Sequence, residues 1–306
     1  RKKERRTRGL FAAPYDRPSL ALFNAHCEQV VERYGLTALH VRRRASACGL
    51  DRDAAVLRLT DGASLRTRNV LFAVGSGDKP RWPVWAPQGH PQVHHVFDPQ
   101  FDGWPARGTE TVAVVGGGIS AGQVALRLLR EGHEVHLICR HALREHQFDS
   151  DPGWLGPRYM SRFEREPDLS ARRTMIDNAR HGGSMPPRVR RALRRAIEQR
   201  QVGWHLASVD DLDDDASRDR RLELRLSNGS RLSVDRVHLA TGFESARPGG
   251  AMLDELISTA SLPCSTCGYP VVDRGLRWHP RVRVSGALAE LELGPSARNI
   301  AGARRA

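Results

Sequence analysis

The sequence is 306 residues long and 40% hydrophobic, which excludes a wholly disordered chain and suggests two domains of about 150 residues each. Its 48 basic and 35 acidic residues leave a net charge of +13, yet no apolar run reaches the ~18–20 residues of a membrane span. The N-terminal residues show no signal-peptide pattern and five cysteines are too few for a disulfide framework, so we expect a cytoplasmic protein.

Two stretches carry most of the positive charge. Residues 1–8 hold six basic residues against one acid, and residues 153–204 hold twelve arginines against five acids. The sequence contains no RNP, zinc-finger or helix-turn-helix pattern. We therefore expect no nucleic-acid partner, and we keep a basic interaction surface as the alternative interpretation.

A repeat links two distant segments. Residues 57–75 and 224–242 align without a gap and share eight of nineteen residues. Each copy predicts a strand, a tight turn and a second strand that ends at an A-x-G sequence. Asp-Gly in the first copy and Asn-Gly in the second favour two-residue hairpin turns in which both central residues have positive φ.

Residues 111–139 predict a strand, a glycine-rich turn, a helix over 119–132 and a second strand over 134–139. The turn reads G-x-G-x-x-A, a pattern that allows a tight turn, close approach of a pyrophosphate and helix–strand packing. In this setting it predicts dinucleotide binding at the N-terminus of the helix. The predicted phosphate-binding residues are Gly116, Gly117, Gly118, Ile119, Ser120 and Ala121.

The end of the second strand indicates which dinucleotide binds. NAD sites usually place an acid there for the ribose 2′-hydroxyl, whereas NADP sites prefer arginine. Here the strand runs into Arg140 and His141, with Arg144 following and no acid before Glu145. We therefore predict NADPH, with Arg140 and His141 at its 2′-phosphate. The alternative is that Arg140 is simply an exposed arginine.

An insert over residues 145–205 follows this motif. Residues 146–161 predict either a long functional loop that lines the active site or a structured surface insert. His146, Asp149 and Asp151 are candidate acid or base groups without an assignable partner, so no catalytic residue is assigned. No histidine spacing indicates a metal site, and we predict none.

Residues 187–200 predict an amphipathic helix within the insert, because its apolar residues recur at helical spacing. The arginines of this segment would then face solvent. The residues expected to face inward are Val189, Leu193, Ala196 and Ile197.

Cys264 and Cys267 form a C-x-x-C sequence in a predicted loop. Such a pair is a redox dithiol in some proteins and half of a zinc site in others, but no second C-x-x-C completes a zinc site. Ordinary loop cysteines are the favoured interpretation, and the other two remain open.

The order of these features resembles flavoproteins with two dinucleotide-binding domains. More narrowly, it resembles the class B flavin monooxygenases, which include flavin-containing and amine N-hydroxylating enzymes. Four segments carry the resemblance: residues 71–83 (LFAVGSGDKPRWP), 113–125 (AVVGGGISAGQVA), 240–244 (ATGFE) and 282–302 (VRVSGALAELELGPSARNIAG).

The resemblance implies both cofactors and an activity. The intact enzyme would reduce FAD with NADPH and use molecular oxygen to hydroxylate a nitrogen or sulfur of a small molecule. The last flavin-domain strand would end at Gly286, and a helix beginning near Pro295 would point its N-terminus at the flavin. The residues that the resemblance places on the flavin side are Gly75, Gly242, Gly286 and Pro295.

The expected fold class is α/β, with a doubly wound, Rossmann-like NADPH domain inserted into a discontinuous, N-terminally incomplete FAD-binding domain. The expected segments are 1–108 for the first FAD-domain part, 109–245 for the NADPH domain and 246–306 for the returning FAD-domain part. Only one glycine-rich turn is present, whereas two domains need two. Gly116 precedes Gly242 by 126 residues, and the same distance back from Gly75 places an FAD turn about 51 residues before Arg1. We therefore expect a missing N-terminus; a protein that never had this turn is the alternative.

Three functions follow from these features. The favoured one is an NADPH-dependent FAD monooxygenase acting on a small molecule. The second is an FAD/NADPH disulfide reductase that uses Cys264 and Cys267. The third is a non-catalytic dinucleotide-binding or basic interaction module. The substrate and the oligomeric state stay unassigned.

Overall fold

The computed structural model describes residues 11–12, 17–75, 77, 79–105, 108–214 and 221–305, so the basic segment 1–8 lies outside the described residues. The chain divides into two compact units. The smaller contains residues 1–46 and 58–64, and the larger contains residues 47–57 and 65–306. Three strands cross the boundary: β3 (Ala45–Leu50), β4 (Ala55–Leu59) and β5 (Ser64–Thr67).

The smaller unit contains one long helix, α2 (Leu20–Arg33). It begins after Ser19, whose Oγ accepts a hydrogen bond from the Leu22 N–H at 3.2 Å and so caps the helix. The remaining elements of this unit are β1 (Phe11–Ala12), β2 (Arg17–Pro18), which pairs antiparallel with β1, and the 3-10 helix η1 (Leu36–Leu39).

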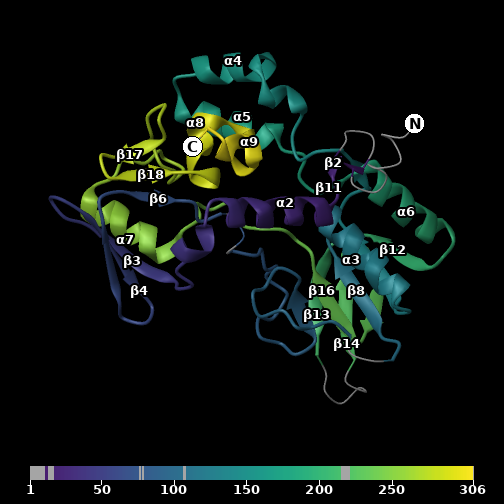
Figure 1. The fold of residues 1–306 in the computed structure, drawn as a ribbon. Coiled ribbons are helices and arrows are strands. Elements are labelled where there is room, and N and C mark those ends of the chain that lie inside the picture. Colours follow the sequence, from purple (N-terminus) through teal and green to yellow (C-terminus); the bar gives the residue numbers. More distant parts are fainter. Residues whose placement is uncertain are drawn as a thin grey trace. The chain divides into compact units, whose positions relative to one another are not determined.

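The larger unit contains a five-stranded parallel sheet with the strand order β12-β9-β8-β16-β7 (Figure 1). From β8 the chain adds β9 and then β12 on one side, and later returns to the other side of β8 as β16. The order therefore reverses between β8 and β16, where open α/β sheets bind their ligands. The strands are β7 (Val93–His95), β8 (Thr111–Val115), β9 (Glu134–Cys139), β12 (Val202–Leu206) and β16 (Arg236–Leu239).

The two faces of this sheet are covered by different elements. The helices α3 (Ile119–Arg130) and α6 (Pro187–Glu198) cover one face, into which Val112 and Val114 point. Ala113 points to the other face, because successive strand residues alternate. That face is covered by an antiparallel sheet of β13 (Val209–Asp213), β14 (Leu222–Leu226) and β15 (Arg231–Val234). The expected α/β fold with a parallel sheet is confirmed, with strands rather than helices on its second face.

The predicted amphipathic helix is confirmed as α6. Leu193 and Ala196 are buried, and Val189 and Ile197 are half-buried against the same core as α3. Four of its arginines are exposed, as expected for a solvated helix face: Arg188, Arg191, Arg194 and Arg195.

A second sheet of the larger unit joins distant parts of the sequence. It has the order β17-β18-β6, and β6 (Val70–Phe72) runs parallel to β18 (Val282–Val284). The helix α7 (Gly250–Ala260) shares the core of this sheet through Leu253 and Leu256, which are fully buried. The third strand is β17 (Arg277–His279), antiparallel to β18.

The elements between β9 and β12 differ from the expected insert in two places. Residues 157–161 belong to a helix rather than to a long loop, which favours the structured alternative, and residues 202–206 form β12 of the parallel sheet. Within the described residues, no helix is both long enough and apolar enough to cross a membrane. The elements are β10 (Arg144–Glu145), η2 (Pro152–Leu155), α4 (Pro157–Arg165), α5 (Leu169–Ala179) and β11 (Ser184–Met185), which pairs in parallel with β10.

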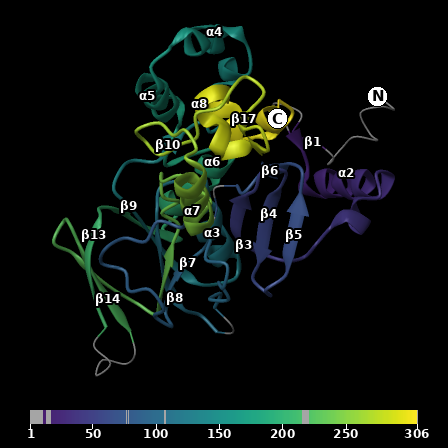
Figure 2. The same cartoon turned by 90° about the vertical axis from the view of Figure 1, so that its left-hand side faces the viewer.

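Short helices follow β18, and one of them begins at Pro295, near where the resemblance implies a helix. Met160 and Phe163 of α4 and Ile176 of α5 share a core with Leu291 of α8, and Figures 1 and 2 both show α5 beside α8. Pro295 occupies the first turn of a four-residue 3-10 helix. The elements are η3 (Gly286–Ala289), α8 (Glu290–Leu293), η4 (Pro295–Arg298) and α9 (Ile300–Ala303).

The repeat predicts the same hairpin turn in both copies. The structure has the same turn in both copies, but its type differs from the predicted one. Gly62 has a φ of +87°, but Asp61 is not among the residues with positive φ. The Leu59 N–H donates to the Ala63 carbonyl, and the Gly62 N–H donates to the Leu59 carbonyl. This is a three-residue loop with one left-handed glycine, so the two-residue prediction is wrong. The second copy makes the same bonds: the Leu226 N–H donates to the Ser230 carbonyl, and the Gly229 N–H donates to the Leu226 carbonyl.

Candidate functional site

A cavity of about 590 Å³ lies at the carboxyl ends of β8, β9 and β16, inside the larger unit. Its walls are the glycine-rich turn after β8, the residues that end β9, the residues that end β16, the segment 81–85 and the pair Gly182–Gly183. The cavity therefore occupies the point at which the strand order reverses, as expected for a dinucleotide site.

Gly116 makes the close approach between two strand ends. Its φ is +149°, and a Cβ at this position would lie 2.4 Å from the carbonyl oxygen of Ala240. That oxygen belongs to the backbone after β16 and cannot move aside. Ala121, fully buried, would lie 3.3 Å from the same Cβ, so its small size also keeps the turn tight.

Gly117 and His141 pack against one another. A Cβ on Gly117 would lie 2.3 Å from the Cys139 sulfur and 2.6 Å from His141 Cε1. A Cβ on Gly183 would lie 2.7 Å from His141 Nε2. The imidazole therefore lies close to both the glycine-rich turn and the insert, and His141 Nδ1 lies 2.9 Å from the Ala142 carbonyl.

Gly118 is the residue that precedes α3. Its φ is −94°, and a Cβ would make only ordinary contact, 3.7 Å from Gly183 Cα, so neither strain nor crowding requires glycine here. No side chain caps α3. The N–H groups of its first turn, which include those of Ile119 and Ser120, lack intrahelical acceptors and are suited to hold a phosphate.

Arg140 and Arg144 are exposed, line the cavity and make no side-chain hydrogen bond or ion pair with another described residue. Many other arginines of the described chain do pair with carboxylates, as Arg190 does with Glu145 at 3.2 Å. Two unpaired guanidinium groups beside a glycine-rich turn form a site for an anion.

The cavity also contains residues that the sequence reasoning missed. Arg81, Trp82 and Trp85 form one wall, and the pair Gly182–Gly183 closes another. The segment RWPVW, directly after the first crossover, was a signal, because two tryptophans with a proline between them suggest a rigid aromatic wall. The Gly-Gly pair in an otherwise arginine-rich insert was a second signal.

A hydrogen-bonded chain connects the end of β16 to that wall. The Phe97 N–H donates to His95 Nδ1 at 3.2 Å, and His95 Nε2 lies 3.1 Å from Thr241 Oγ1. Thr241 donates in turn to the Arg81 carbonyl. These partners require the neutral imidazole with its proton on Nε2. Burial is the main cause that lowers the pKa of His95 to about 4.

The residues predicted for the flavin side lie outside the cavity. Gly75, Gly242 and Gly286 have φ values of +72°, +81° and +64°, and a Cβ on any of them would meet nothing within 4 Å. Each follows a strand closely: β6, β16 and β18. Pro295 is buried at the start of η4. The backbone conformation explains these three glycines, and the role of all four residues stays a prediction.

The candidate acids and base of the insert have structural partners. Asp149 pairs with Arg180 at 2.6 Å, and Asp151 accepts from the Gly153 N–H at 2.7 Å. His146 stacks on His181 with ring centroids 3.7 Å apart. None of them lines the cavity. Among the described residues, no three potential ligands group into a metal site.

Residues 26–180 match the family described as pyridine nucleotide-disulphide oxidoreductase. No curated protein sequence matches the chain.

Solved structures share the fold at low sequence identity. An ornithine N-hydroxylase from Kutzneria sp. 744 has a TM-score of 0.71 at 21% identity, over 94% of this chain and 75% of that chain. The cadaverine monooxygenase DfoA from Erwinia amylovora has 0.67 at 14%, over 93% and 74%. The bacillithiol disulfide reductase Bdr from Staphylococcus aureus has 0.60 at 16%, over 96% and 79%. The predicted fold of flavoproteins with two dinucleotide-binding domains is confirmed.

Proposed function

Because the chain belongs to the pyridine nucleotide-disulphide oxidoreductase family, we propose that it is an NADPH- and FAD-dependent monooxygenase that hydroxylates a nitrogen or sulfur of a small molecule with molecular oxygen. The cavity at the reversal of the strand order, with its glycine-rich turn and unpaired arginines, carries the NADPH part. The fold shared with an ornithine N-hydroxylase and a cadaverine monooxygenase supports the hydroxylation.

The residues of the cavity fit NADPH. Gly116 and Gly117 leave space that a side chain would fill, and the first turn of α3 presents free N–H groups to a pyrophosphate. Arg140 and Arg144 would bind the 2′-phosphate, because a guanidinium donates two parallel hydrogen bonds to phosphate oxygens. His141, which packs against Gly117 and Gly183, would position the turn and lie beside that phosphate.

The fit to FAD is partial. Gly75, Gly242 and Gly286 place left-handed glycines with open space after three strands, as a flavin-side crossover would need. Within the described residues, however, only one glycine-rich turn joins a strand to a helix, and it is assigned to NADPH. FAD, when bound, would supply electron transfer from NADPH to oxygen. This chain's own residues would bind the nicotinamide dinucleotide and fix its orientation.

The test of the proposal is the binding of NADPH and NADH to an Arg140→Glu variant. We expect a loss of about 2 kcal/mol for NADPH, or roughly thirtyfold in Kd, because a carboxylate would replace a donor to the 2′-phosphate. Affinity for NADH should change far less. Arg188→Glu, on the exposed face of α6, is the matched control. Equal NADPH affinity of Arg140→Glu and unmodified protein would refute the assignment.

A disulfide reductase is the second candidate, supported by the fold shared with bacillithiol disulfide reductase. Neither Cys264 nor Cys267 lines the cavity, which favours the monooxygenase. If the chain were a disulfide reductase of this kind, replacing both cysteines by serine would abolish thiol-dependent NADPH oxidation. Under our proposal, oxygen-dependent NADPH oxidation by the FAD-loaded protein survives that replacement.

We also propose a cytoplasmic location and no nucleic-acid partner. All five cysteines are free thiols, which suits a reducing compartment. Part of the arginine charge of residues 153–204 is neutralised within the chain, for instance by Arg172–Glu292 at 3.2 Å and Arg194–Glu198 at 2.7 Å.

A further inference from the structure

Cys264 and Cys267 lie in one reversed loop of the larger unit. Cys264 pairs with Pro270 in an isolated antiparallel bridge, and the Ser265 N–H donates to the Tyr269 carbonyl at 2.9 Å. Cys267 lies between these two bonded residues and is exposed, whereas Cys264 is half-buried. The two thiols therefore share one loop but differ in their access to solvent.

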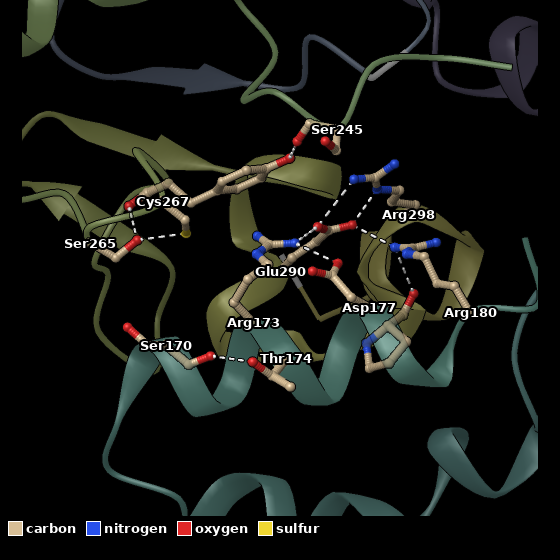
Figure 3. Close-up of polar contacts among 12 residues, drawn as sticks. Ser170, Arg173, Thr174, Asp177, Arg180, Ser245, Ser265, Cys267, Glu290 and Arg298 are labelled. Atoms are coloured by element: carbon tan, nitrogen blue, oxygen red, sulfur yellow. Dashed lines mark hydrogen bonds and ion pairs between the residues drawn. The ribbon is translucent and has the colours of Figure 1, made fainter.

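The sulfur of Cys267 lies between a hydroxyl and a guanidinium (Figure 3). Ser265 Oγ is 3.0 Å from it, and Arg173 lies beside it. Burial raises the pKa of Cys267, but hydrogen bonds from Ser265 and the Tyr269 N–H and the charge of Arg173 lower it further than burial raises it. Burial raises the pKa of Cys264. Cys267 is thus the more readily ionised of the two thiols.

Arg173 is held in position from its other side. Its Nη1 donates to Glu290 at 3.0 Å, and Glu290, which is completely buried, is also bound by Arg180 and Arg298 (Figure 3). The Nε and Nη2 atoms of Arg173 are buried and have no hydrogen-bond partner among the described residues. A negative charge on the sulfur of Cys267 would compensate these two unpaired N–H groups of the guanidinium.

We propose that Cys267 and Cys264 form a dithiol site that is oxidised by hydrogen peroxide. The Cys267 thiolate attacks one peroxide oxygen, so that an S–O bond forms, the O–O bond breaks and hydroxide leaves to become water. The sulfur loses two electrons and the peroxide gains them. Cys264 then attacks this sulfur, an S–S bond forms, and the hydroxyl leaves with the Cys264 proton as water.

No cofactor takes part in this reaction, so the inference goes beyond the proposed function and does not depend on it. The site also differs from a disulfide reductase centre, because no electrons pass from NADPH. Loss of NADPH binding in an Arg140 variant would leave the dithiol reaction unchanged.

The first test measures how fast limiting iodoacetamide modifies each cysteine of the full chain at neutral pH, read by peptide mass spectrometry. Cys267 should react about tenfold faster than the exposed Cys27, because the thiolate is the reactive form. Ser265→Ala should slow Cys267 about fivefold. Ser170→Ala is the matched control, since Ser170 bonds Thr266 of the same loop and makes no hydrogen bond with Cys267.

A variant of Arg173 tests the charge directly. Arg173→Met should slow the reaction of Cys267 more than Arg180→Met, although both remove one arginine from Glu290. Equal slowing in these two variants would mean that the fold around Glu290, rather than the charge beside the sulfur, controls reactivity, and it would overturn the proposal. Ser265→Ala keeps the test valid if Arg173→Met fails to fold.

The second test adds hydrogen peroxide to the full chain in the presence of a metal chelator. The unmodified protein should lose two hydrogen atoms and yield a Cys264–Cys267 disulfide under non-reducing conditions. In Cys264→Ser, Cys267 should gain one oxygen atom and react with dimedone; in Cys267→Ser, neither product should form. The proposal would be overturned if peroxide oxidised Cys27 as readily as Cys267. It would also be overturned if zinc stayed bound to the sulfurs of Cys264 and Cys267 in the presence of the chelator.

Discussion

The two copies of the repeat end in nearly the same sequence but meet different surroundings. Ala73-Val74-Gly75 follows β6, and Ala240-Thr241-Gly242 follows β16. Gly75 and Gly242 share a left-handed φ, at +72° and +81°. Ala73 is exposed and Val74 packs on an apolar core, whereas Ala240 is buried and Thr241 lines the cavity. The shared A-x-G sequence thus gives both crossovers the same backbone conformation at the glycine. Only the second crossover lies beside the glycine-rich turn after β8, and only it lines the cavity.

The largest effect is expected at Gly116, which lies against the Ala240 carbonyl at the end of the second copy. Gly116→Ala would place a Cβ 2.4 Å from the Ala240 carbonyl oxygen and force an alanine to a φ of +149°. We expect a loss of about 3 kcal/mol in the free energy of unfolding, from strain and backbone displacement together. Chemical denaturation with a fluorescence readout measures it.

Gly118→Ala is the control for that variant, because its Cβ would meet only ordinary contacts. The free energy of unfolding should change little, while NADPH affinity falls because the methyl group occupies space next to the pyrophosphate. A Gly116→Ala protein as stable as Gly118→Ala would show that the two strand ends are not held together as the structure describes.

The second-largest effect is a pH dependence of stability, which arises at the end of the second copy because His95 bonds Thr241 there. His95 has a pKa of about 4 when folded and about 6.5 when unfolded, so the unfolded chain binds more protons between these values. Stability therefore falls as the pH drops from 7 toward 4, by about 2 kcal/mol at pH 5. Thermal unfolding at several pH values measures this slope.

His95→Gln should flatten the slope, since a neutral amide cannot take up the proton. Part of the slope should remain, because burial lowers the pKa of His238 to about 3. His26→Gln, at an exposed position of α2, is the control and should leave the slope unchanged. An identical slope in His95→Gln would remove the assigned role of the imidazole.

The sequence predicted the parts of this comparison that depend on short segments. The strand–turn–helix–strand unit, the positions of its glycines and the duplication of the hairpin all follow from spacing along the chain. It did not predict that Arg81, Trp82 and Gly183 line the cavity, because these residues come from separate segments that only the tertiary fold brings together. It also gave no sign that Arg173 and Arg180, which lie outside the predicted amphipathic helix, bind the buried Glu290. Nothing in a single sequence identifies a partner more than one hundred residues away.

The third effect exchanges the residue that distinguishes the two crossovers. Thr241→Val gives the second copy the residue of the first, Val74, with almost the same volume. It removes the hydroxyl that accepts from His95 and donates to the Arg81 carbonyl. We expect a loss of about 1.5 kcal/mol in stability, because two polar groups lose their partner. Thr241→Ser should restore most of it, which separates the hydrogen bonds from the packing.

The smallest effect tests the part that the copies share. Gly62→Ala and Gly229→Ala each force an alanine into a left-handed turn, at φ values of +87° and +81°, and neither Cβ would meet a neighbour within 4 Å. Each should therefore cost about 1 kcal/mol, from backbone conformation alone. Gly62→Asn and Gly229→Asn should cost less, because asparagine tolerates this region. Denaturation midpoints of the four variants decide the question: unequal costs would mean that the surroundings influence even the turn, and that the two copies differ beyond their strand ends.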